Sequence, residues 1–237
     1  MGTTGMIWDD ASPVTLEKPA AVEIAHHGVS VALIADDMPL GDFAWITPNA
    51  VRTLVENHVK VYMQRGFAEH SPYSDMDYAD VGAEFEDEFV RLAAMSPLLV
   101  KFMPFTEEQI GQMREGQIIL STQQAAQMSL PQAEMLLRKK ISALAMNLIR
   151  DAQGLSVTDR ILSETLTPVG LGIALSNFVL PMILNILFSP RFRFALQRTP
   201  ALMQSVYCYD GHLCNAEMAE LLGLPWKDIV TLCWDLN

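Results

Sequence analysis

Five short apolar runs alternate with amphipathic segments over the first two thirds of the chain. They occupy residues 29–35, 59–63, 98–102, 118–120 and 142–146. Short runs with so few polar residues are typical of strands buried on both faces of a sheet. Between them apolar residues recur at helical spacing, as at Val51, Leu54 and Val55 behind Thr47 and Pro48, a cap and a first-turn proline. The alternation predicts an α/β fold: a doubly wound, flavodoxin-like parallel sheet with right-handed crossovers.

A longer apolar run, residues 166–188, follows this pattern and contains no charged residue. A run of this length can span a membrane, form a buried helix, or form a helix that exposes one face to a partner. Asn177, Pro181 and Asn185 interrupt it, and only Arg191 and Arg193 flank it as an orientation signal. We therefore expect a helix of a soluble protein whose uncovered face pairs with a second copy, because a two-fold axis lets one helix cover itself.

This homo-oligomer, most simply a dimer, is expected to form through residues 169–188 and the neighbouring segment 191–196. Its interface is predicted to contain Leu175, Phe178, Val179, Met182, Ile183 and Ile186.

The same pattern divides the chain into three parts. Residues 1–28 are polar and acidic and are expected to form a poorly ordered arm, and residues 29–165 an α/β domain. Residues 166–237, a long apolar C-terminal helix and a short return segment, are expected to complete that domain. Within the return a strand is predicted at 206–208, a turn at 210–212, and a helix at 216–222 that Gly223 ends.

Composition narrows the classes of function. The net charge is −12, from 28 acidic and 16 basic residues, and would oppose binding to phosphate backbones or anionic lipids. We expect no nucleic-acid partner, and a membrane partner is disfavoured. Three cysteines, all near the C-terminus, are too few for a disulfide framework, and the first twenty residues lack a secretory signal pattern. A cytoplasmic protein with reduced thiols is expected, and the fourteen methionines are interpreted as core filling.

Several short motifs, taken in order, resemble one family. Residues 46–48 with Val51 are similar to its "LTP" helix opening, residues 66–85 to its glycine-rich loop ending in "AGAE", and residues 116–120 to its "GxxLF" strand. Residues 173–177 resemble its "IALTN" helix, and residues 210–223 its closing "NGH…A…LG". Over residues 29–224 the chain thus resembles the N-terminal substrate domain of alanine dehydrogenases and pyridine nucleotide transhydrogenases.

The resemblance implies a missing cofactor domain. In that family a dinucleotide-binding domain is inserted before the return helix, whereas here only a few residues follow Glu164. The chain contains no Gly-x-Gly-x-x-Gly, and the pair Gly170 and Gly172 lacks the third glycine, the preceding strand and the later acidic residue of a phosphate-binding turn. We therefore expect no bound dinucleotide or other cofactor in this chain.

The resemblance also places the family's substrate-binding arginine, catalytic lysine and active-site histidine on Phe43, Phe102 and Gln124. Neither Phe nor Gln can grip a carboxylate or titrate near neutral pH. These three residues with Asp42 are predicted to form a vestigial pocket. Lys101 is a weak catalytic candidate, because one step along a strand turns its side chain to the opposite face unless a bulge intervenes.

Other candidate sites have simpler structural explanations. His26 and His27 precede the first strand, and Cys208, His212, Cys214 and Cys233 lack regular zinc-ligand spacing, so no metal site is predicted. Asp36, Asp37 and Asp42 follow a strand end where such sheets bind ligands, but a solvated acidic loop explains them as well. Gln123 and Gln124 could line the vestigial pocket.

Three hypotheses for function remain. The first is a non-catalytic relative of the substrate domain with a binding or scaffolding role. The second is a substrate-domain subunit of an amino-acid or keto-acid oxidoreductase, in which Lys101 and residues 36–42 act together with a separate nucleotide-binding protein. The third is a small-molecule sensor whose ligand, held by Phe43, Phe102 and Gln124, is less charged than a 2-oxo acid.

Overall fold

The computed structural model describes residues 29–36, 42–69, 71–165 and 167–234. The predicted arm, His26, His27 and Asp37 lie outside these residues. Eight strands form one sheet in the order β3-β2-β1-β4-β5-β6-β7-β8. Six strands are parallel: β1 (Ser30–Leu33), β2 (Lys60–Gln64), β3 (Glu84–Glu86), β4 (Leu98–Val100), β5 (Ile118–Ser121) and β6 (Ser142–Ala145). The return strands β7 (Val206–Tyr209) and β8 (His212–Leu213) are antiparallel, so the sheet is mixed.

The α/β class and the double winding are confirmed, with one change to the strand order. Without β3 the parallel strands would follow the flavodoxin order, 2-1-3-4-5. The edge strand β3 extends this to 3-2-1-4-5-6, the order of dinucleotide-binding sheets. The acidic residues Glu84 and Glu86 flank Phe85 in β3, a pattern that suits an exposed edge and not a buried strand.

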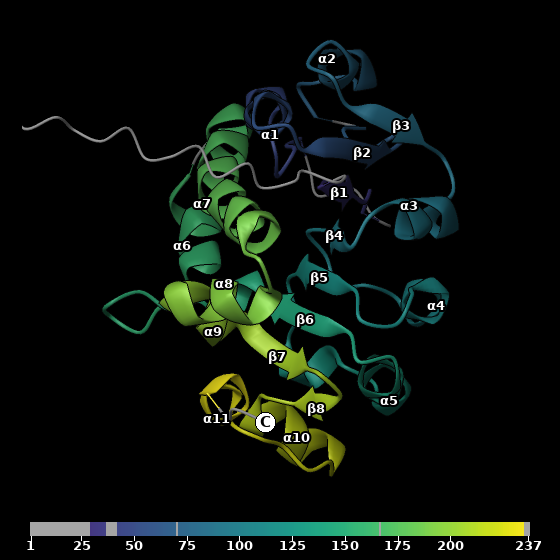
Figure 1. The fold of residues 1–237 in the computed structure, drawn as a ribbon. Helices are drawn as coiled ribbons and strands as arrows, with labels where there is room; N and C mark the ends of the chain where they lie inside the picture. The colour runs from purple at the N-terminus through teal and green to yellow at the C-terminus, as the bar shows by residue number, and fades with distance from the viewer. Residues whose placement is uncertain (1–28, 37–41, 70, 166, 235–237) are drawn as a thin grey trace, which may run out of the picture.

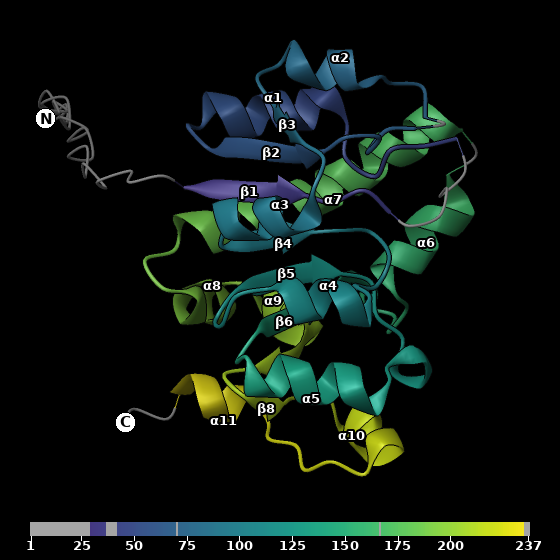
Figure 2. The ribbon, with the colours of Figure 1, turned by 90° about the vertical axis from the view of Figure 1, so that its right-hand side faces the viewer.

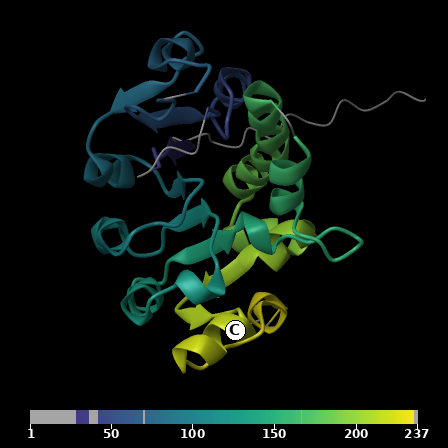
Figure 3. The same cartoon turned by 180° about the vertical axis from the view of Figure 1, so that it is seen from behind.

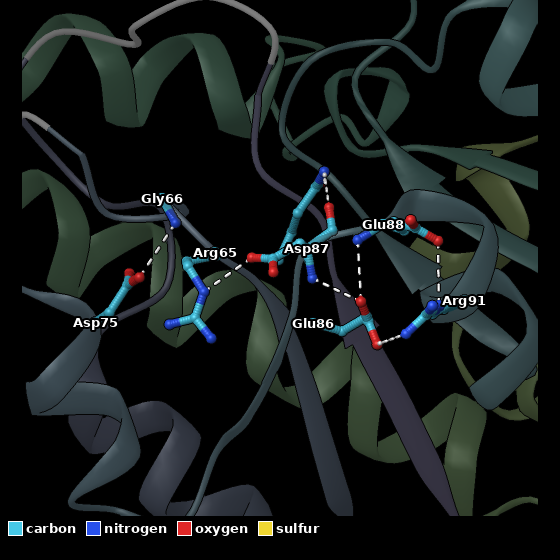
Figure 4. A network of polar contacts seen from close by, with 8 residues as sticks. Arg65, Gly66, Asp75, Glu86, Asp87, Glu88 and Arg91 are labelled. Atoms are coloured by element: carbon cyan, nitrogen blue, oxygen red, sulfur yellow. Dashed lines mark hydrogen bonds and ion pairs between the residues drawn. The ribbon is translucent and has the colours of Figure 1, made fainter.

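Charged side chains cluster around that edge (Figure 4). Arg65 Nε lies 2.8 Å from Asp87 Oδ1, and Arg91 contacts Glu86 at 3.7 Å and Glu88 at 3.1 Å. Most of these side chains are exposed, so each pair contributes little to stability. Their charge instead makes β3 a poor template for pairing with another chain.

Helices cover both faces of the sheet (Figures 1 and 3). On one face lie α3 (Phe89–Met95), α4 (Glu107–Gln112), α5 (Leu130–Arg138) and α10 (Ala216–Leu222). On the other lie α1 (Pro48–Glu56), α2 (Asp75–Ala79), α6 (Val157–Glu164), α7 (Pro168–Phe188), α8 (Phe192–Arg198), α9 (Pro200–Ser205) and α11 (Ile229–Trp234). The short 3-10 helices η1 (Ala125–Gln127) and η2 (Met146–Leu148) follow β5 and β6.

Local sequence signals start several of these helices. A hydroxyl side chain accepts a hydrogen bond from a backbone N–H of the first turn and so satisfies a donor that the helix itself cannot pair. In α4 and α5 the third helical residue, Gln109 or Gln132, returns the bond and completes a capping box. The capping residues of α1, α2, α4, α5, α6 and α7 are Thr47, Ser74, Thr106, Ser129, Ser156 and Thr167.

Helix α7 covers a part of the sheet that the crossover helices leave open. Helices α3, α4 and α5 all pass over one face, so β4, β5 and β6 have no crossover helix on the other. On that face Val100, Leu120 and Leu144 share one apolar cluster with Leu175 and Val179 of α7. Helix α7 therefore forms part of the core of this chain.

The outer face of α7 differs from the inner one. After the first residue, Pro168, its exposed residues recur every fourth position and are Val169, Ile173, Asn177, Pro181 and Asn185. Both asparagines thus face outward, and Asn185 Nδ2 donates to the carbonyl of Pro181 (2.9 Å). Within the described residues α7 is the one helix long and apolar enough to cross a membrane, and 39% of its apolar window is buried inside the chain. Length and composition are thus weak evidence for a membrane span here.

Burial also changes the expected oligomer interface. Of the six side chains assigned to it from sequence, only Phe178 is partly exposed. Leu175, Val179, Met182, Ile183 and Ile186 are at most 5% exposed, because they pack on this chain's own sheet and neighbouring helices. These five cannot form a contact with a second copy in this fold, and self-association itself stays a prediction.

A close approach fixes α7 against the segment that precedes α1. A Cβ on Gly172 would lie 2.7 Å from the carbonyl oxygen of Ala44, so only glycine fits without a shift. Four residues later Ser176 Oγ accepts a hydrogen bond from Thr47 N (2.8 Å) and donates to Gly172 O (2.6 Å). Gly172 of the 166–188 run therefore serves helix packing.

Candidate functional site

The strand order places the expected ligand site between β1 and β4. These neighbours continue to opposite sides of the sheet, and ligands of such sheets bind where the carboxyl ends of the strands diverge. Here Asp36 Oδ1 accepts a hydrogen bond from Met103 N at 2.7 Å, which ties the two strand ends together. Asp36 of the acidic loop is thus engaged with backbone, whereas Asp42 is exposed.

Two aromatic rings occupy the junction. Phe102 is 5% exposed, and its ring meets that of Phe43 edge-on, with centroids 6.1 Å apart and an interplanar angle of 89°. Such edge contacts are favourable and give the site an apolar wall. The structure therefore brings together two of the three residues at which the resemblance placed catalytic side chains.

The third, Gln124, joins Phe102 around a cavity of about 210 Å³ at the carboxyl ends of β4, β5 and β6. Helix α6 lies beside these strand ends (Figure 2) and closes the cavity from outside. The described residues that line it are Phe102, Met103, Pro104, Thr122, Gln124, Gln127, Asn147, Thr158, Asp159 and Leu162. Asp42 and Phe43 are not among them, so the predicted pocket is only partly assembled as expected.

Hydrogen bonds hold several polar groups of this cavity in place. Thr122 Oγ1 donates to the carbonyl of Phe102 (2.7 Å). Asn147 bonds the backbone of Gln123 at both ends of its amide, accepting from the N–H (2.8 Å) and donating to the carbonyl (3.0 Å). Two consecutive strand ends are thereby locked together, which keeps the cavity wall rigid.

Thr158 differs from these residues. It is 1% exposed, and its hydroxyl has no hydrogen-bond partner among the described residues. Burying a hydroxyl without a partner costs about 1–3 kcal/mol, so buried polar groups are rarely left in this state. Because Thr158 lines the cavity, a ligand there could supply the missing partner.

Charge defines what the cavity can hold. Among the described lining residues Asp159 is the only one with an ionisable side chain, and none is Lys, Arg or His. A carboxylate ligand would meet a negative group and no cationic fork. Amide, hydroxyl and aromatic groups favour a small polar molecule without negative charge.

Lys101 lies on the other side of the sheet. Its ammonium donates to Gln109 Oε1 of α4 at 3.2 Å and lies 5.9 Å from the centre of the Phe105 ring. The ladder continues regularly past this residue, with Lys101 N bonded to Leu120 O and Thr122 N to Phe102 O. Without a bulge Lys101 and Phe102 point to opposite faces, and Lys101 does not line the cavity.

The metal candidates do not converge. Among the described residues no group of three or more His, Cys, Asp or Glu side chains could hold a metal ion. Cys208, Cys214 and Cys233 are free thiols, and burial raises the pKa of each, that of Cys214 to about 12. His212 Nδ1 lies 3.0 Å from Asp210 O within the β7–β8 hairpin, which gives it a structural role.

Sequence reasoning missed Thr122, Asn147 and Thr158. Thr122 and Asn147 follow predicted strands, so their position at the carboxyl ends could have marked them as site residues. Thr158 had no such signal, because its place depends on how α6 docks on the strand ends. The fold and the cavity together define a doubly wound α/β domain with a small, weakly charged cavity at the carboxyl ends of its strands.

Comparison with known proteins agrees with this class. Residues 44–160 match the family model "Alanine dehydrogenase/PNT, N-terminal domain", and this part of the chain belongs to that family. The match does not include Asp42, Phe43 or the motifs after residue 160. No curated protein sequence matched the chain.

A solved structure shows the same fold over part of the chain. An L-alanine dehydrogenase superposes with a TM-score of 0.51 at 18% identity over 56% of this chain and 37% of that protein. A transhydrogenase from Sinorhizobium meliloti gives a TM-score of 0.47 at 16% identity over 56% of this chain and 39% of that protein. The chain thus spans well under half the length of either relative. In this chain only residues 165–167 separate α6 from α7.

Proposed function

We propose that this chain is a non-catalytic member of the alanine dehydrogenase/PNT N-terminal domain family that binds a small polar ligand without negative charge. The observation that carries the proposal is the composition of the 210 Å³ cavity, in which Phe102 and Gln124 stand where the resemblance puts a lysine and a histidine. No cation from the described lining residues compensates for them. A 2-oxo acid would lose its ion pair, whereas an amide of the same shape would keep its hydrogen bonds.

Paired ligands that differ only in charge test this proposal. Thermal unfolding is measured with pyruvate and pyruvamide, and with lactate and lactamide, each acid serving as the control for its amide. We expect the amides to raise Tm and the acids to leave it unchanged, because a ligand that binds the native state stabilises it by mass action. Stabilisation by pyruvate but not by pyruvamide, or NADH formation from alanine and NAD, would contradict the proposal.

The alternative, an oxidoreductase subunit that works with a separate nucleotide-binding protein, loses its main residue in this fold. Lys101 contacts Gln109 and Phe105 on the face away from the cavity. Such a subunit would need a partner to bring the missing cations to Phe102 and Gln124.

We also propose that the chain self-associates through the outer face of α7. Val169 and Ile173 are 44% and 48% exposed, and Phe178 is partly exposed. Light scattering should report a dimer for the unmodified chain and a monomer for Ile173→Glu, because a buried carboxylate opposes the contact. Val90→Glu, at an exposed valine on α3, is the matched control. A monodisperse unmodified monomer at micromolar concentration would refute the idea, and dependence on detergent would favour a membrane contact instead.

A further inference from the structure

A second cavity lies at the amino ends of the parallel strands, whereas the 210 Å³ cavity lies at their carboxyl ends. It has a volume of about 380 Å³ and is formed where β5 and β6 begin, beside α8 and the end of β7. Figure 2 shows α8 at the amino ends of the strands, on the side away from α6. This volume falls within the range of about 300–1,000 Å³ that is usual for small-molecule sites.

Cations gather around this cavity in a chain of strongly negative net charge. Lys140, Arg191 and Arg193 all line it, and none of them forms an ion pair with another described residue. The guanidinium of Arg193 lies 5.5 Å from the centre of the Phe194 ring, which holds it in place. Three cations from two separate segments thus face one opening, and their charge remains available to an anion.

A hydroxyl group also lines the same cavity. Ser142, at the start of β6, is 8% exposed, and its Oγ forms no hydrogen bond with a described residue. An anionic oxygen in the cavity would give this hydroxyl an acceptor.

The remaining walls are aromatic and acidic. The rings of Phe192 and Tyr209 are 6.1 Å apart and tilted by 44°, and both border the opening. Burial raises the pKa of Tyr209, so its phenol stays a neutral donor at physiological pH. Glu115 and Asp210 also line the cavity and can only accept hydrogen bonds when ionised.

These groups match different parts of one kind of ligand. The arginines and the lysine suit a phosphate, the carboxylates suit hydroxyl groups, and the rings supply an apolar wall. We propose that this cavity binds a small sugar phosphate. The site is at the amino ends of the strands, away from the 210 Å³ cavity at their carboxyl ends, and does not depend on that cavity.

Calorimetric titration with glucose 6-phosphate, inorganic phosphate and glucose tests the proposal. We expect glucose 6-phosphate to bind, inorganic phosphate to compete more weakly, and glucose to give no signal. The double variant Arg191→Gln/Lys140→Asn should weaken glucose 6-phosphate binding about tenfold or more, the effect of losing 1.4 kcal/mol of contact. Asn is chosen at 140 because φ there is 50°, a conformation that Asn tolerates.

Two further variants separate the parts of the site. Arg198→Gln removes a cation from the same helix but outside the cavity and should leave binding unchanged. Asp210→Asn should reduce the preference for glucose 6-phosphate over inorganic phosphate. The proposal is overturned if about 10 mM glucose 6-phosphate gives no signal, which would mean Kd above that range. It is also overturned if Arg198→Gln weakens binding as much as the double variant while circular dichroism shows both folded.

Discussion

Removing the hydroxyl of Thr158 should affect stability and ligand binding in different ways. Thr158→Val keeps the shape of the side chain and removes a buried group that has no described partner. We expect the free energy of unfolding without ligand to stay constant or rise by about 1 kcal/mol, because the desolvation cost disappears. Binding of a neutral amide should weaken in the same variant. Urea denaturation and thermal shift measure the two effects.

Thr122→Val is the matched control for Thr158→Val. It breaks the 2.7 Å bond to Phe102 O and should lower the free energy of unfolding by about 1 kcal/mol. If Thr158→Val destabilises the protein as much as Thr122→Val, the Thr158 hydroxyl has a partner in solution.

The thiol of Cys214 should make the free energy of unfolding fall as pH rises above about 8.5. Burial raises its pKa to about 12, whereas a thiol in the unfolded chain ionises near 8.5. Between these values the unfolded state releases a proton that the folded state keeps, so stability is full below pH 8.5 and falls as pH rises. Urea denaturation from pH 8 to 11 should show a shallower loss for Cys214→Ser than for the unmodified protein. Identical slopes would mean that Cys214 ionises normally in the folded state.

At the scale of elements, Gly172 allows α7 to approach the segment before α1. Gly172→Ala would put a methyl group 2.7 Å from Ala44 O, and we expect the free energy of unfolding to fall by about 2 kcal/mol or more. Gly111→Ala, in α4 with no atom within 4 Å of the new methyl, should instead stabilise by about 0.4–1 kcal/mol. Urea denaturation of both variants checks the opposite signs. Equal effects would show that the contact with Ala44 is not limiting.

The sequence pattern predicts strands well where both faces of the strand are buried. The five strands found from apolar runs are present, and the cap residue Thr47 and the stop at Gly223 are where they were expected. Strand β3 was missed because acidic residues flank its one aromatic residue at the edge of the sheet. The inner and outer faces of α7 were not distinguished, because both are largely apolar and only the position of the sheet decides between them.

The site was predictable to the extent that strand ends reveal it. Phe102 and Gln124 follow neighbouring parallel strands, so their meeting at one cavity follows from the topology. The loss of Asp42 from that cavity and the addition of Thr158 depend on tertiary packing of loops and of α6. The cationic cavity at the amino ends of the strands is lined by Lys140, which precedes β6, and by residues at the start of α8. These segments meet because the chain returns along the antiparallel strand β7, and the strand pattern of the sequence does not predict that meeting.

At the scale of the whole molecule, the segment after residue 165 belongs to the same core as the segment before it. One apolar cluster contains Val100 and Leu144 from the sheet together with Leu175 of α7 and Leu202 of α9. A fragment ending at residue 165 should therefore unfold without cooperativity and bind a hydrophobic dye, whereas the full chain unfolds in one step. Circular dichroism during urea denaturation makes the comparison. A cooperative transition in the fragment would show that residues 29–165 form an independent domain.

The late position of α7 has a consequence for biosynthesis. The ribosome completes β6 at residue 145, but the helix that covers this face of β4, β5 and β6 begins only at Pro168. Part of the nascent polypeptide lies inside the exit tunnel, so the apolar side chains on that face stay uncovered until translation has moved well beyond residue 188. Nascent chains stalled in this interval should bind ribosome-associated chaperones more than chains stalled earlier or later. Replacing the codons after residue 165 with slowly translated synonymous codons should increase the fraction of aggregated protein.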